Sequence, residues 1–217
     1  MKNLLNKELQ LTMPLLTYLF LGFTAMTFIP GYPILCGAFF VCFGIFQSYQ
    51  IGREDNDILY TVLLPVKKAD AVKSKYAVAV ALEMAAFSLF AVFTGIRMVF
   101  LSDAPVYTTN ALMGANGMFL AFVLVIFAAF NVVFIGGFFK TAYKYGKPFV
   151  CFIAASFVII AIAEALHHLP GLAHLNTLDF SGMAQQLPIL LAAAFLYAAA
   201  TVISCKLSQT RFEKIDL

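Results

Sequence analysis

A few ionisable and amide side chains interrupt the long apolar stretches of this sequence, and they are the first candidates for chemistry. They are Glu83, Arg97, Asn131 and Glu164, followed by a group of histidines. Charged groups are costly inside a membrane, so each must be paired, hydrogen-bonded or functional. Intramembrane catalysis would need paired carboxylates, a serine–histidine pair or a metal triad in one place. We find no such set, because Glu83 and Glu164 are predicted at opposite depths and cannot share a proton.

The depth of these residues along the predicted helices indicates their partners. Glu83 and Asn131 each lie about two turns from the same end of two neighbouring helices. We expect a hydrogen bond between them, and we favour this structural role over a contact with substrate. Arg97 and Glu164 each lie about one turn from the opposite end of their helices. They could form an ion pair there, or the Arg97 guanidinium could instead extend to the lipid headgroups.

Neither a metal site nor a nucleotide site is expected in this chain. The histidines are His167, His168 and His174, with Asp179 nearby, and their His-His-x5-His spacing is not a standard zinc pattern. A phosphate-binding loop needs the pattern Gly-x-x-x-x-Gly-Lys-Ser/Thr, and the sequence around Gly146-Lys147-Pro148 lacks both the upstream glycine and the hydroxyl. We therefore expect no enzymatic activity and no cofactor in this chain itself.

The elements that position these residues are membrane-spanning helices. Of the 217 residues, 62% are apolar and 12% are charged, and the mean hydropathy is +0.91. A soluble domain is nearer half apolar and a quarter charged. One core of this size cannot hide the excess, so the remaining apolar surface must face lipid. The composition therefore predicts an all-α membrane protein rather than a nucleic-acid-binding one.

Hydropathy predicts a single transmembrane domain over residues 1–217 with six spans. An amphipathic segment over residues 1–12 precedes the first span, and a polar outer segment over residues 169–187 precedes the last. The predicted spans cover residues 13–29, 34–50, 76–101, 111–139, 149–168 and 188–205.

The positive charges predict the orientation of these spans. Thirteen of the 14 Lys and Arg residues fall in the two termini, the loop over residues 53–75 and the turn over residues 140–148. These segments all lie on one side of a six-span topology, whereas the three connections on the other side carry none. Since cytoplasmic loops are enriched in Lys and Arg, both termini are predicted to be cytoplasmic.

The loop over residues 53–75 carries the most specific pattern in the chain. An acidic run over residues 53–57 precedes a short apolar stretch that ends at Pro65. Asp and Asn favour helix N-termini and proline ends a helix, so the pattern predicts a two-turn amphipathic helix along the membrane surface. From physics alone, such a helix either anchors the loop to headgroups or docks a partner, and these roles have similar weight. A new helix is expected to begin near Lys67 and Lys68 and to continue into the third span.

This loop resembles the first inner loop of ABC exporter permeases of the type 2 class. The resemblance is carried by Gly52–Lys73, which reads GREDNDILYTVLLPVKKADAVK, and it extends to Ile29–Pro33 upstream and to Glu83 downstream. The family pattern is an acidic, Asn-containing run, a short apolar helix, Leu-Pro-Val, basic residues, an acidic residue and Val-Lys. The six-span layout is similar as well.

The resemblance implies a role for each part of the loop. In such permeases the loop forms a coupling helix that binds a cleft on a separate ATPase subunit. The residues that would contact the ATPase here are Asp57, Ile58, Tyr60, Leu63 and Leu64, with Lys67 and Lys68 at the headgroups. The segment over residues 1–12 resembles an elbow helix, and the segment over residues 169–187 resembles an outer re-entrant region. The family's architecture also implies two ATPase copies holding ATP and Mg, and a second permease copy, identical or paralogous.

The resemblance therefore implies the permease subunit of an ABC exporter in a bacterial inner membrane. A peptide, a lipid or another amphipathic compound would be the substrate. A secondary carrier is the first alternative, but carriers often show inverted repeats, and we find none between the two halves of the chain. A non-transporting immunity or scaffold protein is a further alternative that the sequence leaves open.

Overall fold

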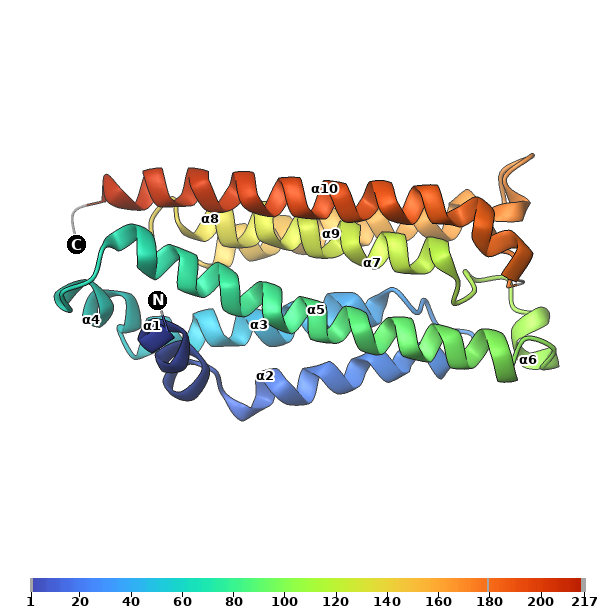
Figure 1. Ribbon diagram of the computed structural model, residues 1–217, viewed down its shortest axis with the longest axis horizontal. Helices are drawn as coiled ribbons and strands as arrows, with labels where there is room; N and C mark the ends of the chain where they lie inside the picture. The colour runs from blue at the N-terminus through green and yellow to red at the C-terminus, as the bar shows by residue number, and fades with distance from the viewer. Residues whose placement is uncertain (1, 179, 216–217) are drawn as a thin grey trace.

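A computed structural model describes residues 2–178 and 180–215, and within these ranges it contains helices and no strand. The long helices run side by side along one axis of the molecule (Figure 1). The described ends of the chain lie at one end of this bundle, together with α4 (Asp57–Leu63). The short α6 (Pro105–Thr108) lies at the other end. We refer to these as the α4 end and the α6 end.

The first part of the chain bends sharply at Pro14. Helix α1 (Lys2–Lys7) continues into a π-helical turn, η1 (Glu8–Thr12), and α2 (Leu15–Leu19) continues into a 3-10 helix, η2 (Phe20–Phe28). The two helical segments meet at an angle of 84°. Proline lacks an N–H and disfavours a helical conformation in the preceding residue, so Met13 is extended and the helix breaks there. As a result, residues 2–12 turn away from the direction of the bundle, as Figure 1 shows.

The connections around α4 explain its short length. Helix α3 (Cys36–Glu54) ends just before Asn56, whose φ of 53° places it in the left-handed region that asparagine tolerates. This residue reverses the chain into α4. At the other end of α4, Leu64 is extended because it precedes Pro65. The next helix, α5 (Lys68–Phe100), then begins at once and runs the length of the bundle (Figure 1).

The second half of the chain consists of three long helical segments. The first of them, over residues 117–138, is one continuous helix whose middle part is π-helical. In order, the elements are α7 (Gly117–Ala129), η3 (Phe130–Ile135), α8 (Gly136–Phe138), α9 (Gly146–Leu166), η4 (Ala173–Asn176) and α10 (Phe180–Glu213).

Helix α7 lies at the centre of the bundle and α10 at its edge. In the most apolar stretch of each helix, 72% of the residues are buried for the α7–α8 segment but 22% for α10. Phenylalanines fill the core around α7 and η3. The rings of Phe46 and Phe149 stack with centroids 3.7 Å apart, and Phe134 packs edge-on against both. The apolar surface of α10 must therefore be covered by lipid or by another chain.

Four helices in the described residues are long and apolar enough to cross a membrane. They cover residues 68–100, 117–138, 146–166 and 182–213, and the bent pair α1–η1 and α2–η2 would make a fifth. Helix α3 lies in the same bundle (Figure 1), but its second half carries Gln47, Gln50 and Arg53, and it is not among them. An all-helical, multi-pass membrane protein is thus confirmed, and the count of six spans stays a prediction.

Helix α7 begins later than the predicted fourth span. A helix was expected from residue 111, but α7 begins at Gly117, and residues 111–116 are not helical. The Asn116 side chain caps α7 by accepting a hydrogen bond from Phe119 N at 3.1 Å. Nearby backbone N–H groups, including those of Met113 and Gly114, donate to side chains from elsewhere in the fold. Local apolar character could not reveal these distant partners.

The last helix is longer than the sequence predicts. The predicted sixth span begins at Pro188, but α10 begins at Phe180 and includes Pro188. Gln186 holds the part before the proline in place. Its Oε1 accepts from Gly117 N at 2.8 Å, and its Nε2 donates to Leu175 O at 3.1 Å. The predicted outer segment 169–187 therefore contains η4 and the first two turns of α10.

Candidate functional site

Helix α4 presents an apolar face outward at its end of the bundle. The side chains of Leu63 and Tyr60 are the most exposed, at 78% and 67%, and Leu59 and Leu64 are exposed beside them. Ile58, in contrast, is half-buried against the core. Exposed apolar patches on a folded protein commonly mark interaction surfaces. We call Leu59, Tyr60, Leu63 and Leu64 the α4 face.

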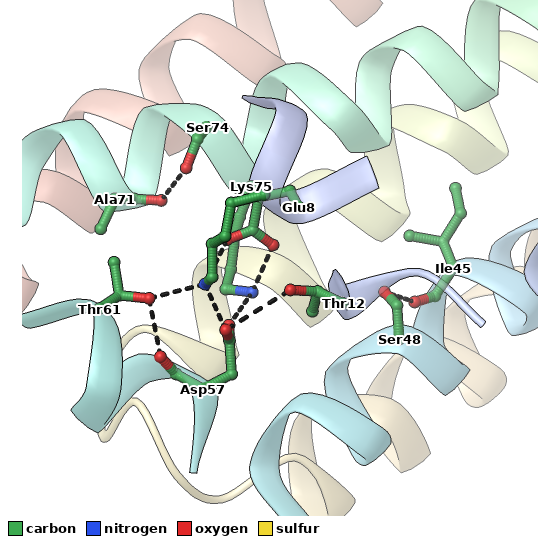
Figure 2. A network of polar contacts seen from close by, with 10 residues as sticks. Glu8, Thr12, Ile45, Ser48, Asp57, Thr61, Ala71, Ser74 and Lys75 are labelled. Atoms are coloured by element: carbon green, nitrogen blue, oxygen red, sulfur yellow. Dashed lines mark hydrogen bonds and ion pairs between the residues drawn. The ribbon is translucent and has the colours of Figure 1, made fainter. Parts of the chain in front are cut away.

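Four charged side chains behind α4 form a buried network that ties it to α1, η1 and α5 (Figure 2). Lys75 of α5 donates to Glu8 Oε2 at 2.8 Å and to Asp57 Oδ2 at 2.9 Å. Lys7 pairs with the other Asp57 oxygen and with Glu8 at 3.2 Å. The four side chains are between 3% and 15% exposed. We call Lys7, Glu8, Asp57 and Lys75 the ion-pair network.

Hydroxyl groups complete this network. Lys7 Nζ also donates to Thr61 Oγ1 at 2.7 Å, and Thr61 in turn donates to the Asp57 carbonyl at 2.7 Å. Thr12 Oγ1 lies 3.5 Å from Asp57 Oδ1 (Figure 2). Two cations and two anions balance, so their mutual attraction and hydrogen bonds offset the desolvation cost of burying them. The network therefore joins α4 to η1 and to the start of α5.

The structure places the five predicted contact residues on two sides of α4. Tyr60, Leu63 and Leu64 lie on the exposed face, where a partner could reach them. Ile58 packs toward the core, and the Asp57 side chain points into the ion-pair network. Sequence reasoning missed Lys7, Glu8 and Lys75. The two lysines were counted for topology only, and no local pattern showed that the three residues contact partners 18 to 67 positions away.

The charge state of Asp57 makes this network dependent on pH. Burial by itself would raise the pKa of the Asp57 carboxyl, but the charges of Lys75 and Lys7 and their hydrogen bonds outweigh it. The net effect lowers the pKa below its ordinary value of 3.8. A lowered pKa in the folded state stabilises the protein fully above the pKa of the unfolded chain, and this stabilisation is lost as the pH falls through the folded value.

We therefore expect Asp57→Asn to reduce thermal stability at pH 7 and to reduce it less below about pH 4. The midpoint of thermal unfolding, measured from pH 7 to pH 3 in detergent, checks this for both proteins. Other carboxyl groups titrate in the same range, so the quantity of interest is the difference between the two curves. A difference that stays constant across the range would contradict the charged role of Asp57.

A cavity of about 240 Å³ lies beside α4. Its walls include Arg53 from the end of α3, Asn56 before α4, Ile58 of α4, and Phe138 and Tyr143 from the chain around the end of α8. The Arg53 guanidinium donates to Tyr143 Oη at 2.8 Å and lies 4.3 Å from the centre of its ring. This contact joins α3 to the turn over residues 139–145. The cavity is large enough for a side chain of a partner.

The predicted hydrogen bond between Glu83 and Asn131 is present. Asn131 Nδ2 donates to Glu83 Oε2 at 2.9 Å, and both residues are fully buried. Tyr197 of α10 donates to the same Glu83 oxygen at 2.6 Å, and Thr201 lies 3.0 Å from Asn131 Nδ2. We call Glu83, Asn131, Tyr197 and Thr201 the intramembrane polar cluster. It joins α5, η3 and α10 by hydrogen bonds that the apolar surroundings favour.

The α10 members of this cluster were missed by sequence reasoning. A second set of bonds links Tyr76 of α5 to Ser204 at 2.8 Å and to Ser208 at 3.0 Å. The polar residues of α10 in the two sets together are Tyr197, Thr201, Ser204 and Ser208. They recur every three or four positions, which places them on one helix face. This spacing was visible in the sequence and could have indicated the stripe.

Arg97 and Glu164 do not pair with each other among the described residues. Arg97 is 2% exposed, donates to Thr27 O at 2.7 Å, and lies 4.1 Å from the centre of the Tyr107 ring. Its side chain is therefore held within the bundle and does not extend from the protein surface. Glu164 Oε2 accepts from Met113 N at 2.7 Å. Both side chains satisfy backbone groups near the α6 end, so matched depth was insufficient to predict their partners.

The histidines lie near the α6 end as well. A ring nitrogen of His167 lies 3.0 Å from Ala111 O, and the rings of His167 and His168 have centroids 4.1 Å apart. The side chains of His174 and Asp179 lie outside the described residues. Among the described residues, no group of three or more His, Cys, Asp or Glu side chains is placed to hold a metal ion.

The fold and the site define a multi-pass helical membrane protein with a short, exposed helix at one end of the bundle. A family model described as ABC-2 family transporter protein matches residues 3–213. The chain therefore belongs to the ABC-2 transporter family, and it is an ABC-2 type permease. Comparisons with curated proteins and with solved structures found no match.

Proposed function

We propose that this permease is the membrane subunit of an ATP-driven exporter and that a separate ATPase subunit binds the α4 face. The observation that carries the proposal is the exposure of Tyr60 and Leu63 on a helix whose opposite side is fixed by buried ion pairs. A helix that only anchored a loop to lipid would not need such a network. Membership of the ABC-2 family supports an ATPase partner in general.

The proposed topology has six spans with both termini in the cytoplasm of a bacterium. In this topology α2 and η2 form the first span and α3 forms the second, with residues 2–12 along the membrane surface as an elbow helix. The described ends of the chain and α4 share one end of the bundle (Figure 1), which supports placing them on the same side of the membrane. The distribution of Lys and Arg favours the cytoplasmic side.

The ion-pair network gives a physical route for coupling. When two ATPase subunits close around ATP and Mg, each would move the α4 helix that it holds. Because Asp57 is bound to Lys75 of α5 and to Lys7 before η1, α4 would move together with both elements as one body. Asp57 would thus act by positioning α4, while Tyr60, Leu63 and Leu64 would contact the ATPase directly.

The remaining parts of the proposed assembly follow from the family architecture. Two permease copies, identical or paralogous, would enclose the transport path between them and would bind two ATPase copies. ATP and Mg would be held by the ATPase, and this chain would contribute no catalytic group. The substrate would be a peptide, a lipid or another amphipathic compound, exported from the cytoplasmic side.

Leu63→Lys is expected to abolish capture of the ATPase while leaving membrane insertion unchanged. A lysine in the centre of an apolar contact must be desolvated without a partner, which costs about 2 kcal/mol or more and weakens binding at least about thirtyfold. The measurement is co-purification, with mass spectrometry identifying the bound protein as an ATP-binding-cassette subunit. Val106→Lys is the matched control, because Val106 is 56% exposed on α6 at the other end of the bundle.

Equal ATPase capture by both lysine variants would show that the α4 face is not the docking surface. Transport in vesicles without ATP would instead favour a secondary carrier. An ATPase that binds the permease in vesicles but drives no transport would favour a scaffold or immunity role. Each of the three functions thus predicts a different combination of ATPase binding and transport. Membrane insertion, measured for every variant, is the internal control.

A further inference from the structure

A groove of about 610 Å³ lies away from the α4 face. It lies between the η3–α8 segment, the first turns of α9 and the last turns of α10. Four basic residues contribute to its walls, and none of its lining residues is acidic. These basic residues are Lys140, Lys144, Lys147 and Arg211. We call this cavity the basic groove.

The walls of the basic groove change from basic to apolar along its length. On α10, the lining residues Ala200, Ile203, Leu207 and Arg211 recur every three or four positions, so they form one stripe. The basic residue of this stripe lies nearest the C-terminus. The η3–α8 segment and the turn after it show the same order, from Val132 and Val133 to Lys140 and Lys144. Two walls of the groove therefore change from apolar to basic in the same direction.

The basic side chains are available to a ligand. Lys140, Lys144 and Lys147 are exposed, and none of them makes an ion pair with any residue that the structure describes. Arg211 makes a contact of 3.3 Å with the Gly136 carbonyl. The N-terminus of α9, at Gly146, lies between two of these lysines in sequence and adds positive potential at the same end. An anionic group would be attracted there.

The length of the stripe matches one leaflet of a membrane. From Ala200 to Arg211, a helix rises about 16 Å, and half of the hydrocarbon core of a bilayer is about 15 Å. Ile203 and Leu207 are 58% and 49% exposed, so this wall is open to whatever surrounds the bundle. A molecule that fits must therefore combine an anionic head with an apolar tail of about this length.

We propose that the basic groove binds an anionic phospholipid of the surrounding membrane, with its phosphate at Lys140, Lys144, Lys147 and Arg211 and one acyl chain along α10. Basic pockets between membrane helices are suited to anionic headgroups. The inference goes beyond the proposed function and does not rest on it, because it needs the protein to be in a membrane but not to bind an ATPase. A lipid in this position would hold α10 against α8 and α9.

The test uses the absence of tryptophan from the chain. Leu207→Trp places the sole indole of that variant in the groove. Val150→Trp is the control, because Val150 does not line the groove although its neighbour Cys151 does. The full chain is reconstituted in phosphatidylcholine with brominated phosphatidylglycerol or brominated phosphatidylcholine. Bromine quenches the fluorescence of a nearby tryptophan, so the extent of quenching gives the relative binding constants of the two lipids. We expect phosphatidylglycerol to be preferred about fivefold or more at position 207 and hardly at all at position 150.

Charge variants then test whether the groove lysines cause this preference. In the Leu207→Trp protein, Lys140→Gln, Lys144→Gln and Lys147→Gln together should reduce the preference to near one. Lys67→Gln, Lys73→Gln and Lys206→Gln remove the same charge outside the groove and should leave it unchanged.

Several results would overturn the proposal. An equal preference at positions 207 and 150, or an equal loss in both charge variants, would indicate general surface attraction. Displacement of the quenching lipid by millimolar glycerol 3-phosphate would show that the groove binds a free phosphate compound instead. The comparison of the two tryptophan positions needs no charge variant, so it decides the question even if the triple variants do not fold.

Discussion

Lys75→Met is expected to destabilise the protein by about 3 kcal/mol or more. Lys75 is the cation that contacts both carboxylates of the ion-pair network, at 2.8 Å from Glu8 and 2.9 Å from Asp57. Its removal leaves two buried carboxylates with Lys7 as their remaining partner. One uncompensated buried charge is more costly than the loss of the whole pair. Reversible unfolding of the full chain in mixed detergent micelles measures this difference.

A charge-balanced variant separates the electrostatic effect from the loss of packing. Lys75→Met combined with Glu8→Gln leaves one cation and one anion, Lys7 and Asp57, and should recover more than half of the lost stability. Lys73→Met, on the same helix with a side chain 46% exposed, is the matched control and should change the stability by less than about 0.5 kcal/mol. If the double variant is no more stable than Lys75→Met, the charge balance of the network is not the cause.

The same lysine also tests the proposed coupling. The charge-balanced double variant keeps α4 paired to Lys7 but removes its link to α5. We therefore expect it to retain ATPase capture, because the α4 face is intact, and to lose most of the transport activity. Normal transport by a folded double variant would contradict the proposal that α4 and α5 move as one body.

Glu83→Leu is expected to have the second-largest effect, a loss of about 2 kcal/mol of stability. The variant removes the oxygen that accepts from Asn131 at 2.9 Å and from Tyr197 at 2.6 Å. Asn131 keeps Thr201 as a neighbour at 3.0 Å, but the Tyr197 hydroxyl loses the one hydrogen-bond acceptor that the described residues show for it. A buried polar group without a partner is costly where water cannot reach it.

Glu83→Gln is the matched control for this prediction. The amide oxygen can still accept from both donors, so we expect a change of less than about 1 kcal/mol in the same unfolding assay. Equal loss of stability in the leucine and glutamine variants would show that the carboxylate charge, not the acceptor oxygen, holds the cluster together. Unchanged stability in both would contradict a structural role for the cluster.

The two clusters are joined by α5. Lys75 and Glu83 are eight residues apart on this helix, which corresponds to about 12 Å along its axis. One end of α5 is thus bound to α4 and η1, while the middle is bound to η3 and α10. The core packing of Phe134 against Phe149 also joins η3 to α9. A displacement of α4 would reach the bundle centre through this single rigid helix.

Sequence reasoning was most successful where the signal is local. The helix at residues 57–63 follows from Asp57 at its first turn and Pro65 beyond its end, and the structure confirms it as α4. The expectation that a helix begins near Lys67 and runs into the third span is confirmed by α5. Apolar periodicity and terminal residues depend on a few neighbouring positions, so one sequence contains the information needed to read them.

Reasoning from depth was correct for one pair but did not identify the partners of Arg97 and Glu164. Glu83 and Asn131 lie at matched depth and bond directly, but Arg97 and Glu164 bind Thr27 O and Met113 N instead. Depth follows from position along a helix, whereas contact also needs the right rotation and the right neighbour. Those two depend on how whole helices pack, and no span reveals them by itself.

For this protein, the sequence by itself determined the membrane class, the family and the place of the short helix that we propose couples to an ATPase. Tertiary structure alone decided how α4 is held. It turned Asp57 inward to Lys75 and Lys7 and left Tyr60 and Leu63 outside. It also gathered lysines from the turn after α8 and from the first turn of α9 beside Arg211 of α10. The physical reason is that buried charges and grooves require partners from distant segments, and the packed bundle alone brings those segments together.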